Sequence, residues 1–295
     1  MRTKRVIAAA AASLIATTGL VACSSETDSS ASNGDDDKVT VKIGTTDADQ
    51  KAWSVFADEA QKAGIDLDIM RFTEYPQVNP AQVEGQIEIS KFQTINYQAQ
   101  YNATAGEDLR IIGSGEINIL GLYWKDHDSL DGIEGAEVAI PNDPSNQGRA
   151  INVLVQAGLL TLNDNVADPL TPTPAEINKD ESKVTVTPVD ASQTPNAYNE
   201  GKPAIINNTW LDRAGIEPSL AVFEDDPESK EAEPYINVFA ARSEDISDET
   251  LNKLVELWQT PEVAEATAKD SKGTSVPVYR DQKELNDILD RLQNK

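Results

Sequence analysis

The sequence predicts an α/β protein, because strand-like and helix-like segments alternate along most of the chain. Strands are indicated by alternating or short apolar runs, such as residues 39–44 and 117–123. Helices are indicated by apolar residues three and four positions apart, as at Leu285, Ile288 and Leu289. With 295 residues, 39% of them hydrophobic, the chain can form one large or two ordinary domains. We expect parallel sheets, since the strands alternate with helices.

The first half of the chain contains five expected strands, at residues 39–44, 67–72, 86–90, 109–112 and 117–123. A helix carrying Trp53 and Phe56 is expected after the first strand, with Asp47 and Gln50 as its capping pair. A loop at 75–80 precedes a short helix at 81–84. Residues 92–103 are expected to form a loop and a helix, and residues 128–133 a short helix.

The second half is expected to hold a helix at 145–160, a strand at 184–186, a helix at 193–199 and strands at 203–206 and 235–241. An acidic surface loop is expected at 224–233. Two helices close the chain. The first carries Leu251, Leu254, Val255 and Trp258, and the second opens with Asp281 and Glu284 as a capping pair.

The segment from Val138 to Arg149 (VAIPNDPSNQGR) contains the strongest local signal. A buried strand ends in a turn at residues 141–144, where Asp143 can cap a helix that has proline at its first position. Free amide groups and the helix dipole make such a helix start an anion site. Asn146 and Arg149 lie in the first two turns, and arginine can bind a carboxylate through two parallel hydrogen bonds. A capped core helix with a surface arginine is the alternative.

The charge of the chain excludes one broad class of partner. The formal net charge is −25, and without residues 1–22, which carry three basic residues and no acid, it becomes −28. Such a charge repels nucleic-acid phosphates and anionic lipid surfaces, so we expect no nucleic-acid partner.

The N-terminus resembles a lipoprotein signal peptide at residues 1–22. A basic start is followed by an apolar segment too short for a confident membrane span, which ends in Leu20-Val-Ala-Cys23. Cys23 is then the lipidated residue, and residues 23–38 form a disordered acidic tether. An ordinary cleaved signal peptide with a free thiol is the alternative. Cys23 is the only cysteine, so we expect no disulfide and no thiolate metal site.

Several short motifs occur in the order seen in methionine-binding NlpA-type lipoproteins, the substrate-binding components of methionine ABC importers. They are Phe92-Gln-x-x-x-Tyr97, Pro141-Asn-Asp-Pro-Ser-Asn-Gln-Gly-Arg149, Ile206-Asn-Asn-Thr209 and Pro234-Tyr-Ile-Asn237. The resemblance covers residues 42–279, and the run that ends at Arg149 is highly specific.

The resemblance implies a two-lobed periplasmic-binding-protein fold with a ligand cleft between the lobes. Lobe 1 would comprise residues 39–118 plus 238–295, and lobe 2 residues 119–237, with crossings near residues 116–121 and 235–238. The protein would be lipid-anchored on the extracytoplasmic face of a cell membrane. It would have an ABC transporter permease as its partner and no cofactor.

The resemblance also implies the ligand-binding residues. Arg149 would bind the carboxylate of an amino acid, and Asn146, Asn207 and Asn237 would bind its amino and carboxylate groups. The side chain of the ligand would lie against aromatic residues, whose rings suit a thioether. These are Tyr75, Phe92 and Tyr97.

One departure from the family pattern concerns the side-chain pocket. The family usually has Phe-Gln-His-x-Pro-Tyr, where this chain has Thr94 in place of histidine and Asn96 in place of proline. Threonine cannot present a flat ring, so the ligand is expected to be methionine, a related amino acid or a short peptide.

Two other classes of function are open to the sequence. An enzyme is not expected, because no nucleophile, phosphate-loop or dinucleotide motif occurs and the sole histidine, His127, is expected on the solvated surface. A surface lipoprotein of the same fold, acting through protein contacts without transport, is the alternative to a transport protein.

Overall fold

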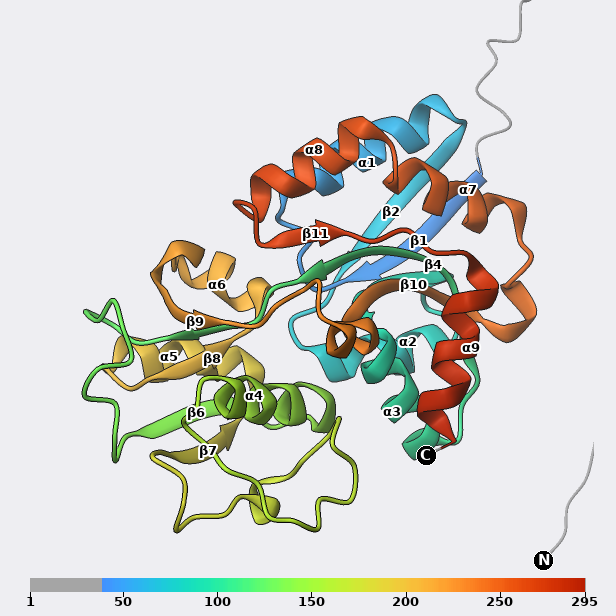
Figure 1. The fold of residues 1–295 in the computed structure, drawn as a ribbon. Helices are drawn as coiled ribbons and strands as arrows, with labels where there is room; N and C mark the ends of the chain where they lie inside the picture. The colour runs from blue at the N-terminus through green and yellow to red at the C-terminus, as the bar shows by residue number, and fades with distance from the viewer. Residues whose placement is uncertain (1–38, 295) are drawn as a thin grey trace, which may run out of the picture. The chain divides into compact units, whose positions relative to one another are not determined.

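A computed structural model describes residues 39–294, and these residues form two β-sheets covered by helices (Figure 1). The expected signal peptide, Cys23 and tether lie outside the described residues. We call the six-stranded sheet with its helices the larger lobe and the five-stranded sheet with its helices the smaller lobe.

The sheet of the larger lobe has the strand order β11-β4-β10-β3-β1-β2. Strands β1, β2 and β3 are parallel, whereas β10 runs antiparallel to both β3 and β4, and β11 antiparallel to β4. The strands are β1 (Val39–Thr45), β2 (Ile65–Arg71), β3 (Ile89–Thr94), β4 (Leu109–Asn118), β10 (Ile236–Arg242) and β11 (Ser275–Pro277).

Helices cover both faces of this sheet. One face packs against α1, α7 and α8 through a core that includes Trp53, Phe56 and Trp258, and the other packs against α3 and α9 through a core that includes Ile95 and Leu289. The helices of this lobe are α1 (Lys51–Lys62), α2 (Val78–Val83), α3 (Ile95–Ala105), α7 (Glu249–Trp258), α8 (Pro261–Asp270) and α9 (Gln282–Gln293).

The sheet of the smaller lobe has the order β7-β6-β8-β5-β9, with β6 parallel to β7 and β8 and with β5 antiparallel to β8 and β9. Helix α4 packs on one face, and α5 and α6 pack on the other. These elements are β5 (Gly121–Tyr123), β6 (Glu137–Pro141), β7 (Thr185–Val189), β8 (Ala204–Ile206), β9 (Ala221–Glu224), α4 (Pro144–Gln156), α5 (Thr194–Asn199) and α6 (Asn208–Ala214).

Short 3-10 turns complete the elements: η1 (Tyr75–Gln77), η2 (Pro174–Glu176), η3 (Ala191–Gln193), η4 (Pro218–Leu220), η5 (Lys230–Tyr235) and η6 (Ser243–Asp245). The chain passes between the sheets at two places. It leaves the larger sheet where β4 ends at Asn118 and enters the smaller sheet at Gly121, and it returns through η5 into β10 at Ile236. The two crossing segments therefore connect the lobes.

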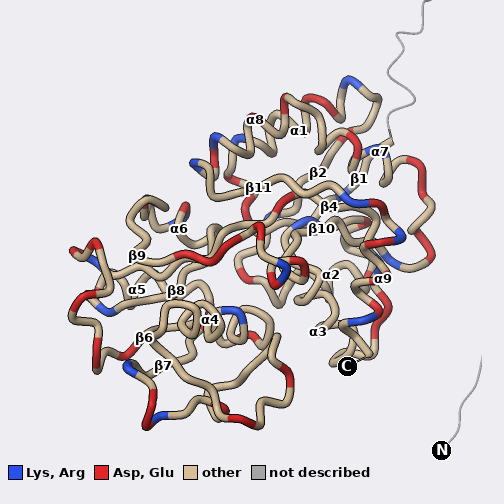
Figure 2. Tube along the Cα trace, viewed as in Figure 1, with Lys and Arg blue, Asp and Glu red and all other residues tan. Residues whose placement is uncertain are grey.

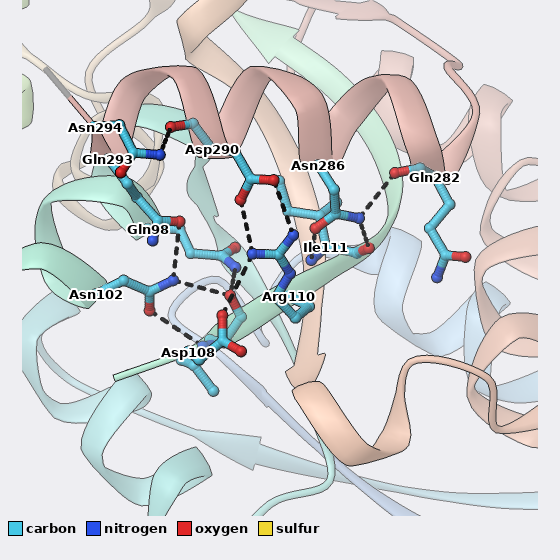
Figure 3. Close-up of polar contacts among 11 residues, drawn as sticks. Gln98, Asn102, Asp108, Arg110, Ile111, Gln282, Asn286, Asp290, Gln293 and Asn294 are labelled. Carbon is cyan, nitrogen blue, oxygen red and sulfur yellow. Dashed lines mark hydrogen bonds and ion pairs between the residues drawn. The ribbon is translucent and has the colours of Figure 1, made fainter. Parts of the chain in front are cut away.

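The C-terminal helix α9 is fixed to the larger lobe by polar contacts (Figure 3). The amide of Asn286 donates to the Ile111 carbonyl at 2.7 Å and accepts from the Ile111 N–H at 3.2 Å. The Arg110 guanidinium bonds to the Asp290 carboxylate at 2.8 Å. In Figure 3, Asn102 and Gln98 bond to the chain just before Arg110, so α3, β4 and α9 form one polar network. The last segment of the chain thus completes the lobe that begins with β1.

The structure corrects several expectations. The sheets are mixed rather than parallel, because the returning strand β10 runs against its neighbours in the larger sheet and β5 runs against its neighbours in the smaller one. Residues 128–133 form turns, not a helix. Three helices rather than two close the chain, because α8 was missed: its first turn is built on Pro261, and Val263 is its one fully buried apolar residue. The segment 224–233 was expected to be a surface loop, yet it includes the last residue of β9 and much of η5.

Capping differs between the two helices for which a capping pair was expected. Asp281 caps α9 as expected, since its side chain accepts from the Glu284 N–H. Gln50 precedes α1 without a side-chain cap, and Asp47 instead accepts from the indole N–H of Trp53 at 2.8 Å. Asp47 therefore fixes a core tryptophan rather than the helix end.

The negative charge is distributed over both lobes (Figure 2). Acidic residues occur on loops and helix ends in each of them, with lysines and arginines between them. No helix within residues 39–294 has the length and apolar character needed to cross a membrane.

Candidate functional site

A single pocket between the two sheets is lined by all eight side chains that were expected to bind a ligand. The larger lobe contributes residues from η1, β3, α3 and β10, and the smaller lobe contributes residues from α4 and from the β8–α6 junction. The eight are Tyr75, Phe92, Thr94, Tyr97, Asn146, Arg149, Asn207 and Asn237.

Arg149 is buried at 4% exposure and is held by groups that the sequence did not reveal. Its Nε donates to one carboxylate oxygen of Asp225 at 2.8 Å, and its Nη2 lies 2.7 Å from the same oxygen and donates to the Asn118 carbonyl at 2.8 Å. The guanidinium lies 4.5 Å from the centre of the Tyr235 ring. Nη1 has no hydrogen-bond partner among the described residues, so one edge of the guanidinium is fixed and the other can bind an anion.

Asp143 starts a chain of hydrogen bonds that orients two amides of the pocket. The Asp143 carboxylate accepts from the side-chain amide of Asn146 at 3.0 Å, and the Asn146 carbonyl accepts from the Asn207 amide at 2.9 Å. The side-chain carbonyl oxygen of Asn207 is buried and has no partner among residues 39–294. The chain therefore presents an acceptor to the pocket, as an ammonium group would need.

The start of α4 does not offer the free amide groups that the sequence suggested. Asp143 caps the helix, and its carboxylate accepts from the Asn146 N–H at 2.9 Å. Burial raises the pKa of this carboxyl, against the opposing effect of the hydrogen bonds from Asn146. Because the Asp143 carboxylate occupies the N-terminal end of α4, Arg149 is the group of this helix that can bind an anionic ligand.

The three expected aromatic residues form one wall of the pocket. Ring centres lie 6.2 Å apart for Tyr75 and Phe92, 6.2 Å for Tyr75 and Tyr97, and 5.7 Å for Phe92 and Tyr97. Trp210 of α6 does not line the pocket but packs on Tyr75, with ring centres 5.3 Å apart. Burial raises the pKa of both tyrosines well above the usual value, so their hydroxyls stay protonated at neutral pH.

Both residues that depart from the family pattern have structural roles. Thr94 caps α3, since its hydroxyl accepts from the Tyr97 N–H at 3.2 Å. Asn96 donates to the Ser145 hydroxyl of the smaller lobe at 3.0 Å. Thr94 also lies opposite Asn237 in the pairing of β3 with β10, which brings both side chains to the pocket. The Asn237 side chain has no hydrogen-bond partner in the described part of the chain.

The pocket contains further charged residues that sequence reasoning missed. Lys91 of β3 and Glu116 of β4 form an ion pair there, and Asp225 holds Arg149. Lys91 is the one charged residue of β3 and Glu116 is one of two in β4, and a charged residue within a strand was the available signal. Asp225 lies within an acidic run, which favoured a surface location, so the sequence held no comparable signal for it.

Further contacts join the lobes beside the pocket. Asn208 of α6 donates to the Thr274 hydroxyl at 2.9 Å. Arg213 of α6 donates to the carbonyls of Phe72 and Thr73, each at 3.1 Å, and also to that of Thr46. The smaller lobe therefore contacts the larger one directly at α6 as well as at Ser145.

His127 shows no sign of a site. It is exposed, its ring stacks on Trp124 with centres 3.3 Å apart, and Nδ1 lies 2.8 Å from the Lys125 carbonyl. In the described part of the chain, no group of three or more His, Cys, Asp or Glu side chains is placed to hold a metal ion.

The orienting role of Asp143 predicts a specific effect of the substitution Asp143→Ala. Loss of the cap should lower the free energy of unfolding by about 1 kcal/mol, and loss of the orienting carboxylate should weaken ligand binding. Asp281→Ala is the matched control, because Asp281 caps α9 in the same way, away from the pocket. Denaturant unfolding and calorimetric titration measure the two effects. Equal ligand affinity in the two variants would contradict an orienting role for Asp143.

Two lobes joined by two crossing segments, with a polar and aromatic pocket between them, define a two-lobed binding protein of the periplasmic type. The sequence matches the NlpA lipoprotein family over residues 41–279. The chain belongs to this family.

Individual relatives agree with this assignment. The chain is 32% identical over 240 residues to the probable D-methionine-binding lipoprotein MetQ of Vibrio cholerae, covering 80% of this chain and 87% of that protein. Protein PG110 of Staphylococcus aureus has a similar structure, with a TM-score of 0.80 and 32% identity, and the match covers 85% of this chain and 99% of that chain. A nutrient-binding protein of Burkholderia cenocepacia, solved bound to methionine, matches with a TM-score of 0.74 and 29% identity, and the match covers 80% of this chain and 99% of that chain. The expected two-lobed fold and family are confirmed.

Proposed function

We propose that this protein is an extracytoplasmic, lipid-anchored substrate-binding protein that delivers methionine or a related amino acid to an ABC importer. The names of the relatives support the class of ligand, since they include D-methionine-binding lipoproteins and the substrate-binding protein of a methionine transporter. These relatives are named as binding proteins rather than enzymes. Cys23 is the proposed site of lipidation, after removal of residues 1–22, and residues 23–38 are the proposed tether.

The geometry of Arg149 carries the proposal for this chain. A buried arginine with one edge held by Asp225 and with Nη1 free suits a carboxylate, which accepts charge-assisted hydrogen bonds from a preorganised donor. The ammonium group of the ligand is assigned to the oriented carbonyl of Asn207, with Asn146 behind it and Asn237 as a further hydrogen-bonding residue in the pocket. A zwitterionic amino acid meets both requirements at once.

The aromatic wall is proposed to hold the side chain of the ligand. Tyr75, Phe92 and Tyr97 offer ring faces and edges, which make favourable contacts with a thioether sulfur. Thr94 is engaged in capping α3 and is smaller than the histidine usual in the family, so it leaves the selection of the side chain to the rings. Methionine is therefore the first candidate ligand.

Closure of the lobes over the ligand is the proposed mechanism. We place the lobes at residues 39–118 plus 238–295 and at residues 119–237. Contacts such as Asn208–Thr274 and those of Arg213 with the larger lobe would form on closure and would stabilise the bound state. Release would follow when the permease favours the open arrangement.

A ligand screen tests the proposal. Native mass spectrometry of residues 24–295 as purified should detect a bound small molecule, and a thermal-shift screen of the twenty amino acids, D-methionine and short methionine peptides should show stabilisation by a subset of them. A protein that is empty and unresponsive to the whole panel would contradict the proposal. That result would favour a surface lipoprotein that acts through protein contacts.

A further inference from the structure

A buried ion pair lies where the pocket continues beyond the residues assigned to the amino acid. Lys91 Nζ is 2.6 Å from Glu116 Oε1, and the two side chains are only 4% and 6% exposed. The Lys91 ammonium group also lies 4.3 Å from the centre of the Trp258 ring. A buried charge pair is costly to desolvate and is not needed to stabilise a fold. Its position at a ligand pocket therefore suggests a role in binding.

Lys91 and Glu116 line two adjoining hollows. One is the pocket described above, and the other, which we call the second hollow, extends between α6 of the smaller lobe and α8 of the larger lobe. Asn118, Asn208 and Thr209 also line both. The ion pair thus lies at the junction between the two hollows, within reach of a ligand bound in either of them.

Two acceptor atoms at this junction have no partner among residues 39–294: Glu116 Oε2 and Asn208 Oδ1. Lys91 engages only the other oxygen of Glu116. A buried carboxylate oxygen without a hydrogen bond is costly, and a donor that supplies one recovers that cost. Asn208 cannot be turned to supply its own donor without losing the bond from its Nδ2 to Thr274. Both atoms can therefore accept a hydrogen bond from a donor outside residues 39–294, such as a ligand.

The charges around the second hollow favour a positively charged donor. Asp47, Asp212 and Asp270 line it, and its one other cation besides Lys91 is Lys272, which pairs with Glu217. Burial, followed by the charge of Asp270, raises the pKa of Asp212. A negative potential of this kind attracts a cation and repels a second carboxylate.

We propose that Glu116, positioned by Lys91, receives an ammonium group of the ligand at this junction. The inference rests on the proposed function, since it assumes an amino-acid ligand in the pocket. The ammonium group has two possible sources. It is either the α-ammonium of a neutral amino acid such as methionine, which then donates to both the Asn207 carbonyl and Glu116, or the side-chain ammonium of a diamino acid such as lysine that reaches into the second hollow while its α-ammonium binds Asn207. In both cases the ligand must carry an unblocked ammonium group.

Calorimetric titration of the wild-type protein and the Glu116→Gln variant tests this with three named probes: L-methionine, N-acetyl-L-methionine and L-lysine. Wild-type protein should bind L-methionine or L-lysine. If Glu116 receives the α-ammonium group, wild-type protein should bind N-acetyl-L-methionine at least 100-fold more weakly than L-methionine. In Glu116→Gln, the affinity for L-methionine should fall at least tenfold if Glu116 receives the α-ammonium group. If Glu116 receives the side-chain ammonium group, only the affinity for L-lysine should fall by that factor.

A double variant separates ligand binding from the structural role of the pair. Glu116→Gln leaves Lys91 buried without a counter-charge, so it should lower the unfolding temperature. Adding Lys91→Met removes that charge and keeps an unbranched chain against Trp258, so stability should recover while ligand affinity stays low. Recovery of affinity in the double variant would show that Glu116 only neutralises Lys91, and it would overturn the inference.

A matched control and the wild-type titration make the remaining outcomes decisive. Glu137→Gln removes one partner of the exposed Glu137–Lys202 ion pair on β6 and should leave both affinity and stability unchanged. If the wild-type protein binds a probe and Glu116→Gln binds it equally well, the inference is wrong and the proposed function stands. If the wild-type protein binds another amino acid of the thermal-shift panel but neither L-methionine nor L-lysine, the inference is wrong and the proposed function stands. If it binds no member of that panel, the proposed function is contradicted and the inference falls with it.

Discussion

The Arg149→Ala variant is expected to weaken amino-acid binding by roughly 2–5 kcal/mol, the cost of removing one partner from a buried hydrogen-bonded charge pair. The reason lies in the fixed geometry of this side chain. Asp225 and the Asn118 carbonyl hold Nε and Nη2, which leaves Nη1 as the donor for the ligand carboxylate. Calorimetric titration with the best ligand of the screen measures the loss.

Two further variants separate binding from folding in this experiment. Arg149→Lys keeps a positive charge beside Asp225 but lacks the second edge of the guanidinium, so affinity should fall while the unfolding temperature changes less than in Arg149→Ala. Arg110→Ala removes an arginine of the same kind that pairs with Asp290 on α9, and it should leave affinity unchanged. Full affinity in Arg149→Ala would refute the assignment of the carboxylate site.

The largest expected loss of stability follows the substitution Phe56→Ala, about 3–5 kcal/mol. Phe56 is fully buried in the larger lobe, and its ring centre lies 5.9 Å from that of Trp53, 5.2 Å from that of Trp258 and 6.5 Å from that of Phe239. Truncation leaves a cavity between α1, α7 and β10, which these rings cannot fill without leaving their edge-to-face arrangement.

Denaturant unfolding measures this effect as a lower midpoint with an unchanged slope. Tyr279→Ala serves as the control, because Tyr279 is 47% exposed and its truncation should change the free energy of unfolding by no more than about 0.5 kcal/mol. A loss in Phe56→Ala no larger than that of Tyr279→Ala would show that this aromatic cluster does not hold the larger lobe together.

Local sequence patterns predicted an element correctly where one or two residues determine its position. The capped helix α4 was predicted to begin at Pro144 with Asp143 as its cap, and α9 to be capped by Asp281, because proline and aspartate determine these positions directly. The direction of β10 could not be predicted in this way. It depends on the chain returning from the other lobe, which is a tertiary constraint that no local pattern records.

The same division applies to the site. The family motifs contain side chains that line one pocket, because their positions in the sequence place them on β3, on α4 and at the β8–α6 junction. Asp225 could not be predicted as the partner of Arg149, because 76 residues separate the two and only the packing of the smaller lobe against the crossing segment brings them together. The sequence likewise did not indicate that Lys91 pairs with Glu116, because their strands β3 and β4 lie on either side of β10 in the sheet.

A crystal structure of the protein with the best ligand of the thermal-shift screen would show which atoms bind the ligand's carboxylate and ammonium groups. We expect an amino acid in the pocket between the lobes, with its carboxylate within hydrogen-bond distance of Arg149 Nη1 and its ammonium group within hydrogen-bond distance of the Asn207 side-chain carbonyl. A ligand bound outside this pocket, or one whose carboxylate makes no contact with Arg149, would refute the proposed binding site.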